Sequence, residues 1–190
     1  MLKIAVILSS VRPGRLNDRV AKMIIKEING LGHEAIVIDP LQPKYSLPLV
    51  QTPLQYYKNQ SQAPSQLHDI SNDLKSADAF VVVSAEYNHS IPPALTNLMD
   101  HFGPEYKRKP SGICCYSVGP FGGVRAGVAL RPYLAVLGCS SIPTMFAIPT
   151  AGGSINEDGT VNEPRVTSGA QSFISELVWY GEALKNHREN

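Results

Sequence analysis

Short apolar runs alternate along the chain with segments in which apolar residues recur every three or four positions. The first run covers residues 2–8, and apolar residues then recur at helical spacing from Val20 to Leu31, where Gly32 stops the pattern. This order predicts a strand, a loop and a helix. The same unit repeats: strands are expected at 2–8, 35–38, 79–84, 113–117 and 139–147, and helices at 20–31, 65–77, 92–102, 123–137 and from Pro164 onwards.

Three boundary features refine this prediction. Ser65 is a candidate N-cap, and Pro92 and Pro93 suit a first helical turn. Pro132 lacks an amide proton, so it is expected to kink or weaken the helix at 123–137.

The fold class follows from the apolar runs and from the alternation of elements. Unbroken apolar runs are typical of strands covered on both faces, and strand–helix alternation favours parallel pairing with right-handed crossovers. We therefore predict an α/β fold, a three-layer, doubly wound, five-stranded parallel sheet. The order 2-1-3-4-5 needs only five strands and places the ligand loops after strands one, three and four.

A long connection, residues 40–64, interrupts the alternation. It carries five prolines together with apolar and tyrosine side chains, which argues against disorder. Because connections of this length are usually lids, interfaces or disordered, we expect an ordered arm that covers either a partner subunit or its own domain.

Composition narrows the class of protein. The 190 residues, 43% apolar and 17% charged, fit one domain over residues 1–190. A formal charge of +1 favours neither nucleic acid nor a membrane surface as partner, and no apolar stretch is long enough for a membrane span or a signal peptide. A cytoplasmic protein is expected. Cys114, Cys115 and Cys139 lie in apolar runs without CxxC spacing, so we expect buried, reduced thiols and no metal site.

Loop one, residues 9–17, joins the first strand to the first helix and is a candidate phosphate site. Its hydroxyls and guanidinium groups lie beside the free amides of a helix N-terminus, which favour an anion. It matches neither a Walker A loop nor a GxGxxG fingerprint. The alternative is a solvated turn in which Ser10 or Asn17 caps the helix.

Loops three and four are suited to a flat ring. Loop three, residues 85–91, brings Tyr87 and several amide groups to the end of the third strand. Loop four, residues 117–123, has three glycines that let the backbone approach a ligand, although a plain tight turn would also use them. A phosphate site and two ring-binding loops on one sheet edge match FMN better than ATP.

Three ordered motifs give the chain a resemblance to a known family over nearly its whole length. Residues 9–15, Ser-Ser-Val-Arg-Pro-Gly-Arg, resemble Gly-Ser-x-Arg-x-Gly-Ser/Arg; residues 85–92, Ala-Glu-Tyr-Asn-His-Ser-Ile-Pro, resemble Pro-Glu-Tyr-Asn-x-Ser-x-Pro; a glycine-rich fourth loop follows. These motifs resemble the flavodoxin-like NADPH-dependent FMN reductases, which include quinone, azo-dye and chromate reductases. Departures from the family pattern are Ser9 for Gly, Ala85 for Pro, Pro93 for Gly and Thr96 for Lys.

The resemblance implies an FMN-dependent oxidoreductase. Hydride would pass from NADPH or NADH to bound FMN, and electrons would then pass to a quinone, azo, metal or flavin acceptor in a ping-pong reaction. No side chain is expected to be catalytic, and a homodimer or homotetramer is implied. The implied FMN contacts are Ser10, Arg12, Arg15 and Asn17 for the phosphate, Glu86, Tyr87, Asn88 and Ser90 for the isoalloxazine and ribityl side, and Ser117, Gly119, Phe121 and Gly122 for the pyrimidine end.

Two alternatives stay open. A flavin-holding electron carrier or redox-sensing interaction partner would have the same loops, although the near-neutral charge lacks the acidic surface that often steers small carriers. A nucleotide hydrolase would need a carboxylate cluster for a metal near loop one, where only Asp18 lies close in sequence.

Overall fold

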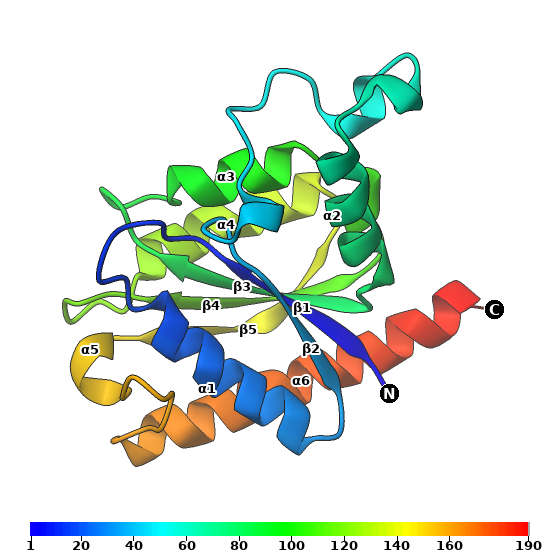
Figure 1. Cartoon of the computed structure of the whole chain (residues 1–190). Helices are drawn as coiled ribbons and strands as arrows, with labels where there is room; N and C mark the ends of the chain where they lie inside the picture. Colours follow the sequence, from blue (N-terminus) through cyan, green and yellow to red (C-terminus); the bar gives the residue numbers. More distant parts are fainter. Residues whose placement is uncertain (190) are drawn as a thin grey trace.

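The computed structural model describes residues 1–189 and contains a five-stranded parallel sheet between two layers of helices (Figure 1). The strand order is β2-β1-β3-β4-β5, which confirms the predicted flavodoxin-like order. The strands are β1 (Lys3–Leu8), β2 (Glu34–Ile38), β3 (Ala79–Ala85), β4 (Pro110–Tyr116) and β5 (Ser140–Ile148).

Two helical layers cover the sheet. In Figure 1, α1 and α6 lie below it, and α2, α3 and α4 lie above it. The helices are α1 (Asn17–Gly30), α2 (Ser65–Ser76), α3 (Pro93–Asp100), α4 (Val124–Val136), α5 (Ala151–Ser154) and α6 (Pro164–Glu189).

The core lies on both faces of the sheet. Every residue of β3 and of β4 is buried, whereas exposed and buried residues alternate irregularly along β5, which forms one edge. One apolar cluster packs β1 and β3 against α1 and α6, and a second packs them against α2, α3 and α4. This two-sided burial is why the strands read as continuous apolar runs in the sequence.

Several helix and strand boundaries in the structure differ from the predicted ones. β4 begins at Pro110, three residues before the predicted start, because Pro110 and Ser111 pair with Ser140 and Ser141 of β5. Ser65 is the first residue of α2 and makes no capping hydrogen bond, so its prediction as an N-cap is wrong. The helix α4 runs from Val124 to Val136 with Pro132 inside it.

Two further elements differ from the prediction. Leu31 lies beyond the end of α1 and is half exposed, whereas the other apolar residues of the predicted pattern are buried. The four-residue helix α5 was not predicted, because its Ala-Gly-Gly-Ser sequence carries no helical periodicity.

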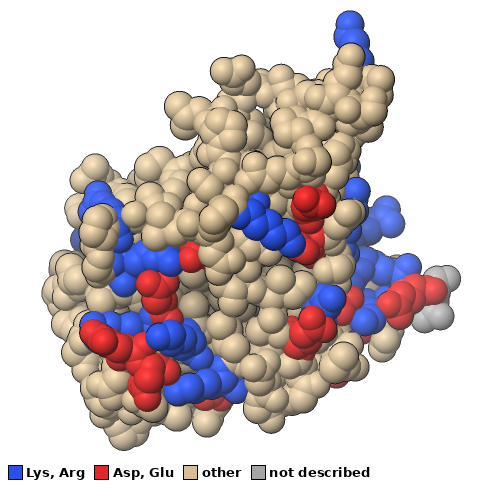
Figure 2. All heavy atoms as spheres, in the orientation of Figure 1, with Lys and Arg blue, Asp and Glu red and all other residues tan. Residues whose placement is uncertain are grey.

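The arm of residues 40–64 is built from short turns. It contains three 3-10 helices, η1 (Pro43–Tyr45), η2 (Leu54–Tyr56) and η3 (Gln60–Gln62). In Figure 1 it is the cyan segment that rises above α2 and α3. Its charged side chains are two lysines, Lys44 and Lys58, and it has no acidic residue. The rest of the visible face mixes acidic and basic side chains without a large patch of one sign (Figure 2).

Candidate functional site

Loops one, three and four meet at the carboxyl ends of β1, β3 and β4. They enclose a cavity of about 210 Å³. Ligands of open α/β sheets bind at this edge, where the strand order reverses beside β1. The cavity is lined by Ser10, Arg12, Pro13, Gly14, Arg15, Leu16, Ala85, Glu86, Tyr87, Tyr116, Ser117 and Val118.

Two serine hydroxyls join loop one to loop three. The buried Ser9 accepts a hydrogen bond from the backbone N–H of Ala85 at 2.8 Å. The hydroxyl groups of Ser10 and Tyr87 lie 2.5 Å apart and share a hydrogen bond. Serine at position 9, where the family pattern has glycine, therefore fixes the spacing of the two loops.

The Arg15 guanidinium is paired with carboxylates of its own chain. Its guanidinium donates to both oxygens of Asp39 at 2.7 and 2.6 Å, pairs with Asp18 at 2.7 Å and donates to the carbonyl of Ser10 at 2.8 Å. The side chains of Arg15 and Asp39 are 9% and 8% exposed. These contacts tie loop one to the end of β2, so Arg15 holds the loop in shape.

The electrostatics of this pair agree with its geometry. The hydrogen bond to Asp39 raises the pKa of Arg15 even though burial opposes the charge. Burial alone would raise the pKa of Asp39, but hydrogen bonds from Arg15 and from the N–H of Leu41 hold it below its usual value. Both side chains therefore stay charged at neutral pH.

Arg12 is the contrasting cation of loop one. It is exposed, and it has no carboxylate partner among residues 1–189. Its guanidinium lies over the ring of Tyr87, with Cζ 3.6 Å from the ring centre. Arg12 is thus the guanidinium of this loop that remains available to an anion.

Asn17 starts α1 and is completely buried. Neither its amide nitrogen nor its amide oxygen has a hydrogen-bond partner. The buried hydroxyl of Tyr116, at the end of β4, also lacks one. Buried polar groups without partners are costly, so unsatisfied groups at this edge fit a polar ligand.

Loop three is a tight turn. Tyr87 and Ser90 exchange two backbone hydrogen bonds, and Asn88 and His89 between them have φ angles of 50° and 61°. This conformation is that of a type I′ turn, which presents exposed side chains at its tip. Asn88, His89 and Ser90 are all exposed.

Glu86 points away from the turn to the neighbouring helix. It accepts hydrogen bonds from the backbone N–H groups of Arg125 and Ala126, at 2.9 and 3.4 Å, and pairs with the Arg125 guanidinium at 3.2 Å. A carboxylate at a helix N-terminus is stabilising. The Glu86 side chain therefore anchors α4 to loop three.

Loop four approaches the end of β5 closely. Thr150 donates its backbone N–H to the carbonyl of Gly119, which also accepts the Ser117 hydroxyl at 2.8 Å. Gly123 has a φ of 74°, and a Cβ atom there would lie 2.6 Å from the Tyr116 carbonyl oxygen. The tight backbone leaves Phe121 61% exposed beside the turn.

The cavity brings together half of the predicted contact residues. Asn17 is buried and does not line the cavity, and the tips of loops three and four also lie outside its lining. The predicted residues that line it are Ser10, Arg12, Arg15, Glu86, Tyr87 and Ser117; those that do not are Asn17, Asn88, Ser90, Gly119, Phe121 and Gly122.

Sequence reasoning missed three residues that shape the site. Asp39 clamps Arg15, Tyr116 lines the cavity with an unsatisfied hydroxyl, and the 80% exposed Val118 forms its rim. A signal for Asp39 and Tyr116 was present, because each stands where a strand ends at the ligand edge.

The described residues place neither a set of metal ligands nor an exposed thiol at this site. Over the described residues 1–189, no cluster of three or more His, Cys, Asp or Glu side chains is placed to hold a metal ion. The cysteines are buried and unpaired, and burial raises the pKa of Cys115 and of Cys139 to about 12. In the same part of the chain, no helix is long and apolar enough to cross a membrane.

Comparison with known proteins assigns the family. Residues 2–153, which include all three loops, match the family of NADPH-dependent FMN reductases. The chain belongs to this family. Membership makes the protein an FMN-dependent oxidoreductase that uses NAD(P)H, as the motifs predicted.

Individual relatives of the reductase support this assignment. The chain is 28% identical to a quinone reductase of Escherichia coli (strain K12) over 72% of this chain and 71% of that one. It is 27% identical to an NAD(P)H-dependent FMN reductase of Nectria sp over the full length of both. Its fold resembles that of the flavoenzyme NAD(P)H:(acceptor) oxidoreductase FerB of Paracoccus denitrificans, with a TM-score of 0.80 at 22% identity over 96% and 98% of the chains.

Proposed function

We propose that this reductase takes hydride from NADPH or NADH and delivers electrons to a quinone or another small acceptor in two successive half-reactions. The observation that carries the proposal is the meeting of three loops at the switch point of the sheet, where Arg12 has no carboxylate partner in the described chain and the buried Asn17 amide has no hydrogen-bond partner. The quinone reductase name of a relative supports the choice of acceptor.

The residues present fit FMN. Arg12 would bind the phosphate together with the Ser10 hydroxyl and the amides at the start of α1. Asn17, buried and unpartnered, would donate from beneath the loop. Arg15, although expected at the phosphate, would act by positioning this loop through Asp39.

The flavin ring would lie beside loops three and four. The 210 Å³ cavity is smaller than the roughly 300–1,000 Å³ of typical ligand sites. It therefore suits the phosphate and ribityl end, and the ring would lie over Tyr87, Asn88 and Ser90 with Phe121 beside it. Gly119 and Gly122 would let the backbone approach its pyrimidine end.

The redox chemistry would be supplied by the cofactor. When bound, FMN supplies hydride acceptance from the nicotinamide and electron transfer to the second substrate. The protein's share would be orientation and electrostatics, and no side chain is proposed as a nucleophile. Amide donors at Asn88 and in loop four would favour negative charge on the ring.

The structure also bears on the hydrolase alternative. Asp18 and Asp39 both lie near loop one, but both are paired with Arg15. Neither carboxylate is therefore free to recruit a metal ion for nucleotide hydrolysis.

An absorbance experiment tests the proposal. The purified protein is saturated with FMN, and NADPH or NADH is added without oxygen. Rapid bleaching of the flavin bands, with recovery on adding a quinone, is the expected result. A flavin that binds but bleaches slowly would support the carrier or sensor role instead, and failure to bind FMN would contradict the site.

Self-association is a further part of the proposal. The arm exposes Leu41 and Tyr56 at 52% and 71%, and residues 40–64 contain two lysines and no acidic residue. We expect a homodimer or homotetramer with the arm at a subunit boundary. Sedimentation of the wild type and of Tyr56→Glu measures their oligomeric states. The charge added at position 56 should weaken association of the variant, and a monomeric wild type would contradict the proposal.

A further inference from the structure

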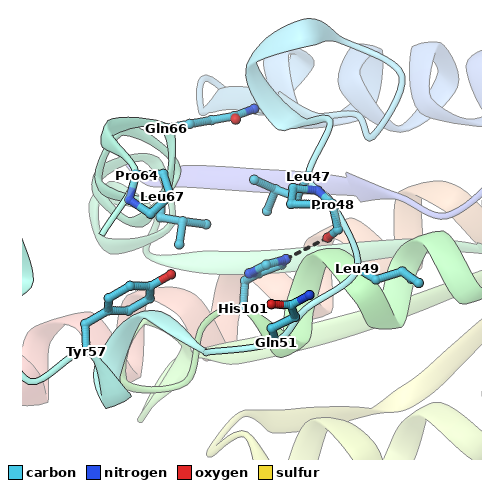
Figure 3. A pocket seen from close by; sticks show the side chains of 9 residues that line it. All are labelled: Leu47, Pro48, Leu49, Gln51, Tyr57, Pro64, Gln66, Leu67 and His101. Carbon is cyan, nitrogen blue, oxygen red and sulfur yellow. Dashed lines mark hydrogen bonds between the residues drawn. The ribbon is translucent and has the colours of Figure 1, made fainter. Parts of the chain in front are cut away.

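A second cavity of about 380 Å³ lies beneath the arm, away from the three loops (Figure 3). None of its lining residues belongs to loop one, three or four. We call it the arm pocket, and it is lined by Leu47, Pro48, Leu49, Gln51, Tyr57, Pro64, Gln66, Leu67 and His101.

The walls of the arm pocket are apolar and uncharged. Leucine and proline side chains form most of the lining, with the ring of Tyr57 at one side, and no Asp, Glu, Lys or Arg takes part. The amide nitrogen of Gln66 is already used, since it donates to the carbonyls of Pro43, Lys44 and Ser46. The pocket thus suits an apolar body of small-ligand size.

His101 supplies one unsatisfied polar atom to this pocket. The residue is 4% exposed, and its Nε2 lies 3.1 Å from the carbonyl oxygen of Pro48. Because a carbonyl only accepts, Nε2 must carry the proton of that hydrogen bond. In the neutral ring Nδ1 is then a bare acceptor, and this buried atom has no partner.

The position of Nδ1 points to the occupant. In Figure 3 this nitrogen turns away from Pro48, towards the side of the cavity that Tyr57 and Leu67 line. A buried acceptor left without a donor costs free energy that a ligand O–H would recover. Flat proline and tyrosine surfaces would pack against a ring.

We propose that the arm pocket binds a small uncharged phenol, whose hydroxyl donates to Nδ1 of His101 and whose ring packs among the leucines and prolines. The site is separate from the FMN site. Its occupant does not need to be a substrate of the reductase.

Calorimetric titration of the FMN-saturated protein with phenol and with anisole tests the proposal. Anisole has a similar ring but no donor, so phenol is expected to bind about tenfold more tightly. The His101→Phe variant keeps a ring of similar size and loses the acceptor, so the two affinities should become equal. Leu49→Ala, at a position 82% exposed, should weaken phenol and anisole alike without affecting folding.

A second measurement keeps the test valid if His101→Phe does not fold. The ¹⁵N resonance of Nδ1 of His101 in the wild type should shift on adding phenol and stay unchanged on adding anisole, while the flavin spectrum stays unchanged. Equal affinity of the wild type for the two compounds, a discrimination that survives in His101→Phe, or a water-filled pocket that phenol does not enter would overturn the proposal.

Discussion

The loops at the carboxyl edge of the sheet and the arm of residues 40–64 both lack long elements, but different interactions hold them. At the sheet edge, the loops are fixed by the Arg15–Asp39 ion pair and by glycines with positive φ. The arm is held by uncharged side chains that reach its carbonyls, such as Asn97 and His101. The site is therefore fixed by close packing and by a buried ion pair. The arm is held by neutral hydrogen bonds, by buried apolar side chains such as Leu54, and by one partly exposed ion pair between Lys44 and Asp73.

The largest expected effect is at the glycines of loop four. Gly123→Ala should lower the free energy of unfolding by about 3 kcal/mol, because alanine is strained at a left-handed φ and its Cβ would meet the Tyr116 carbonyl. Urea denaturation measures the change. Gly119→Ala is the matched control, since no atom lies within 4 Å of its added Cβ and its φ is unstrained; equal losses in both variants would contradict the argument.

The ion pair of loop one comes next. Asp39→Asn should cost about 2 kcal/mol of stability, because Arg15 would keep only Asp18 as a charged partner. Thermal and urea unfolding report the loss. Asp69→Asn, at an exposed position, should change stability little, and a similar effect at both positions would show that the pair is not structurally important.

Arg12 tests the site without a change in the fold. Arg12→Ala should weaken FMN binding about tenfold to a hundredfold, because a charge-assisted hydrogen bond to phosphate contributes about 1.5–3 kcal/mol. Quenching of flavin fluorescence measures the affinity. Riboflavin, which lacks the phosphate, should bind the variant and the wild type alike; equal weakening for riboflavin would place Arg12 at the ring instead.

The arm should respond more weakly and more locally. Asn97 accepts from the N–H of Val50 at 2.9 Å and donates to the carbonyls of Leu47 and Pro48. Asn97→Ala should cost about 1 kcal/mol and speed hydrogen exchange at Val50. Thr96→Ala is the control, because Thr96 bonds only within its own helix. Faster exchange throughout the sheet would show that the arm and the core unfold together.

Acid should remove the contribution of the Arg15–Asp39 pair and leave the Asn97 hydrogen bonds to the arm unaffected. The folded-state pKa of Asp39 is lowered, so its contribution is fully present above the unfolded-state value of about 3.9. It is lost as the pH falls through the folded-state pKa. The stability difference between the wild type and Asp39→Asn should therefore shrink below about pH 4, whereas the difference for Asn97→Ala should not.

The strands and their order in the sheet could be predicted from the sequence for a physical reason. Strands buried on both faces must be apolar throughout, so β1 and β3 were visible as runs, and their order followed from the alternation with helices. The start of β4 was not visible, because proline and serine, at positions 110 and 111, are not typical of a strand interior and only their pairing with β5 makes them part of it. The helix α5 was not visible because its Ala-Gly-Gly-Ser sequence has no helical periodicity.

The site was predicted in position more than in detail. The three loops and their convergence followed from the strand order. The role of Arg15 did not, because its partner Asp39 lies 24 residues away and only the folded chain brings the two together. Likewise, nothing in the sequence around Glu86 shows that its carboxylate binds the start of α4.

The pairing of Arg15 with Asp39 has a consequence for how this sequence can change over generations. Replacing Arg15 alone leaves the buried Asp39 carboxylate without its ion-pair partner, and replacing Asp39 alone leaves Arg15 with only Asp18. We therefore expect the two positions to change together. In a related sequence that has serine at position 15, we expect an uncharged residue at position 39. Transferring loop one into a related protein would likewise require transferring Asp39 as well.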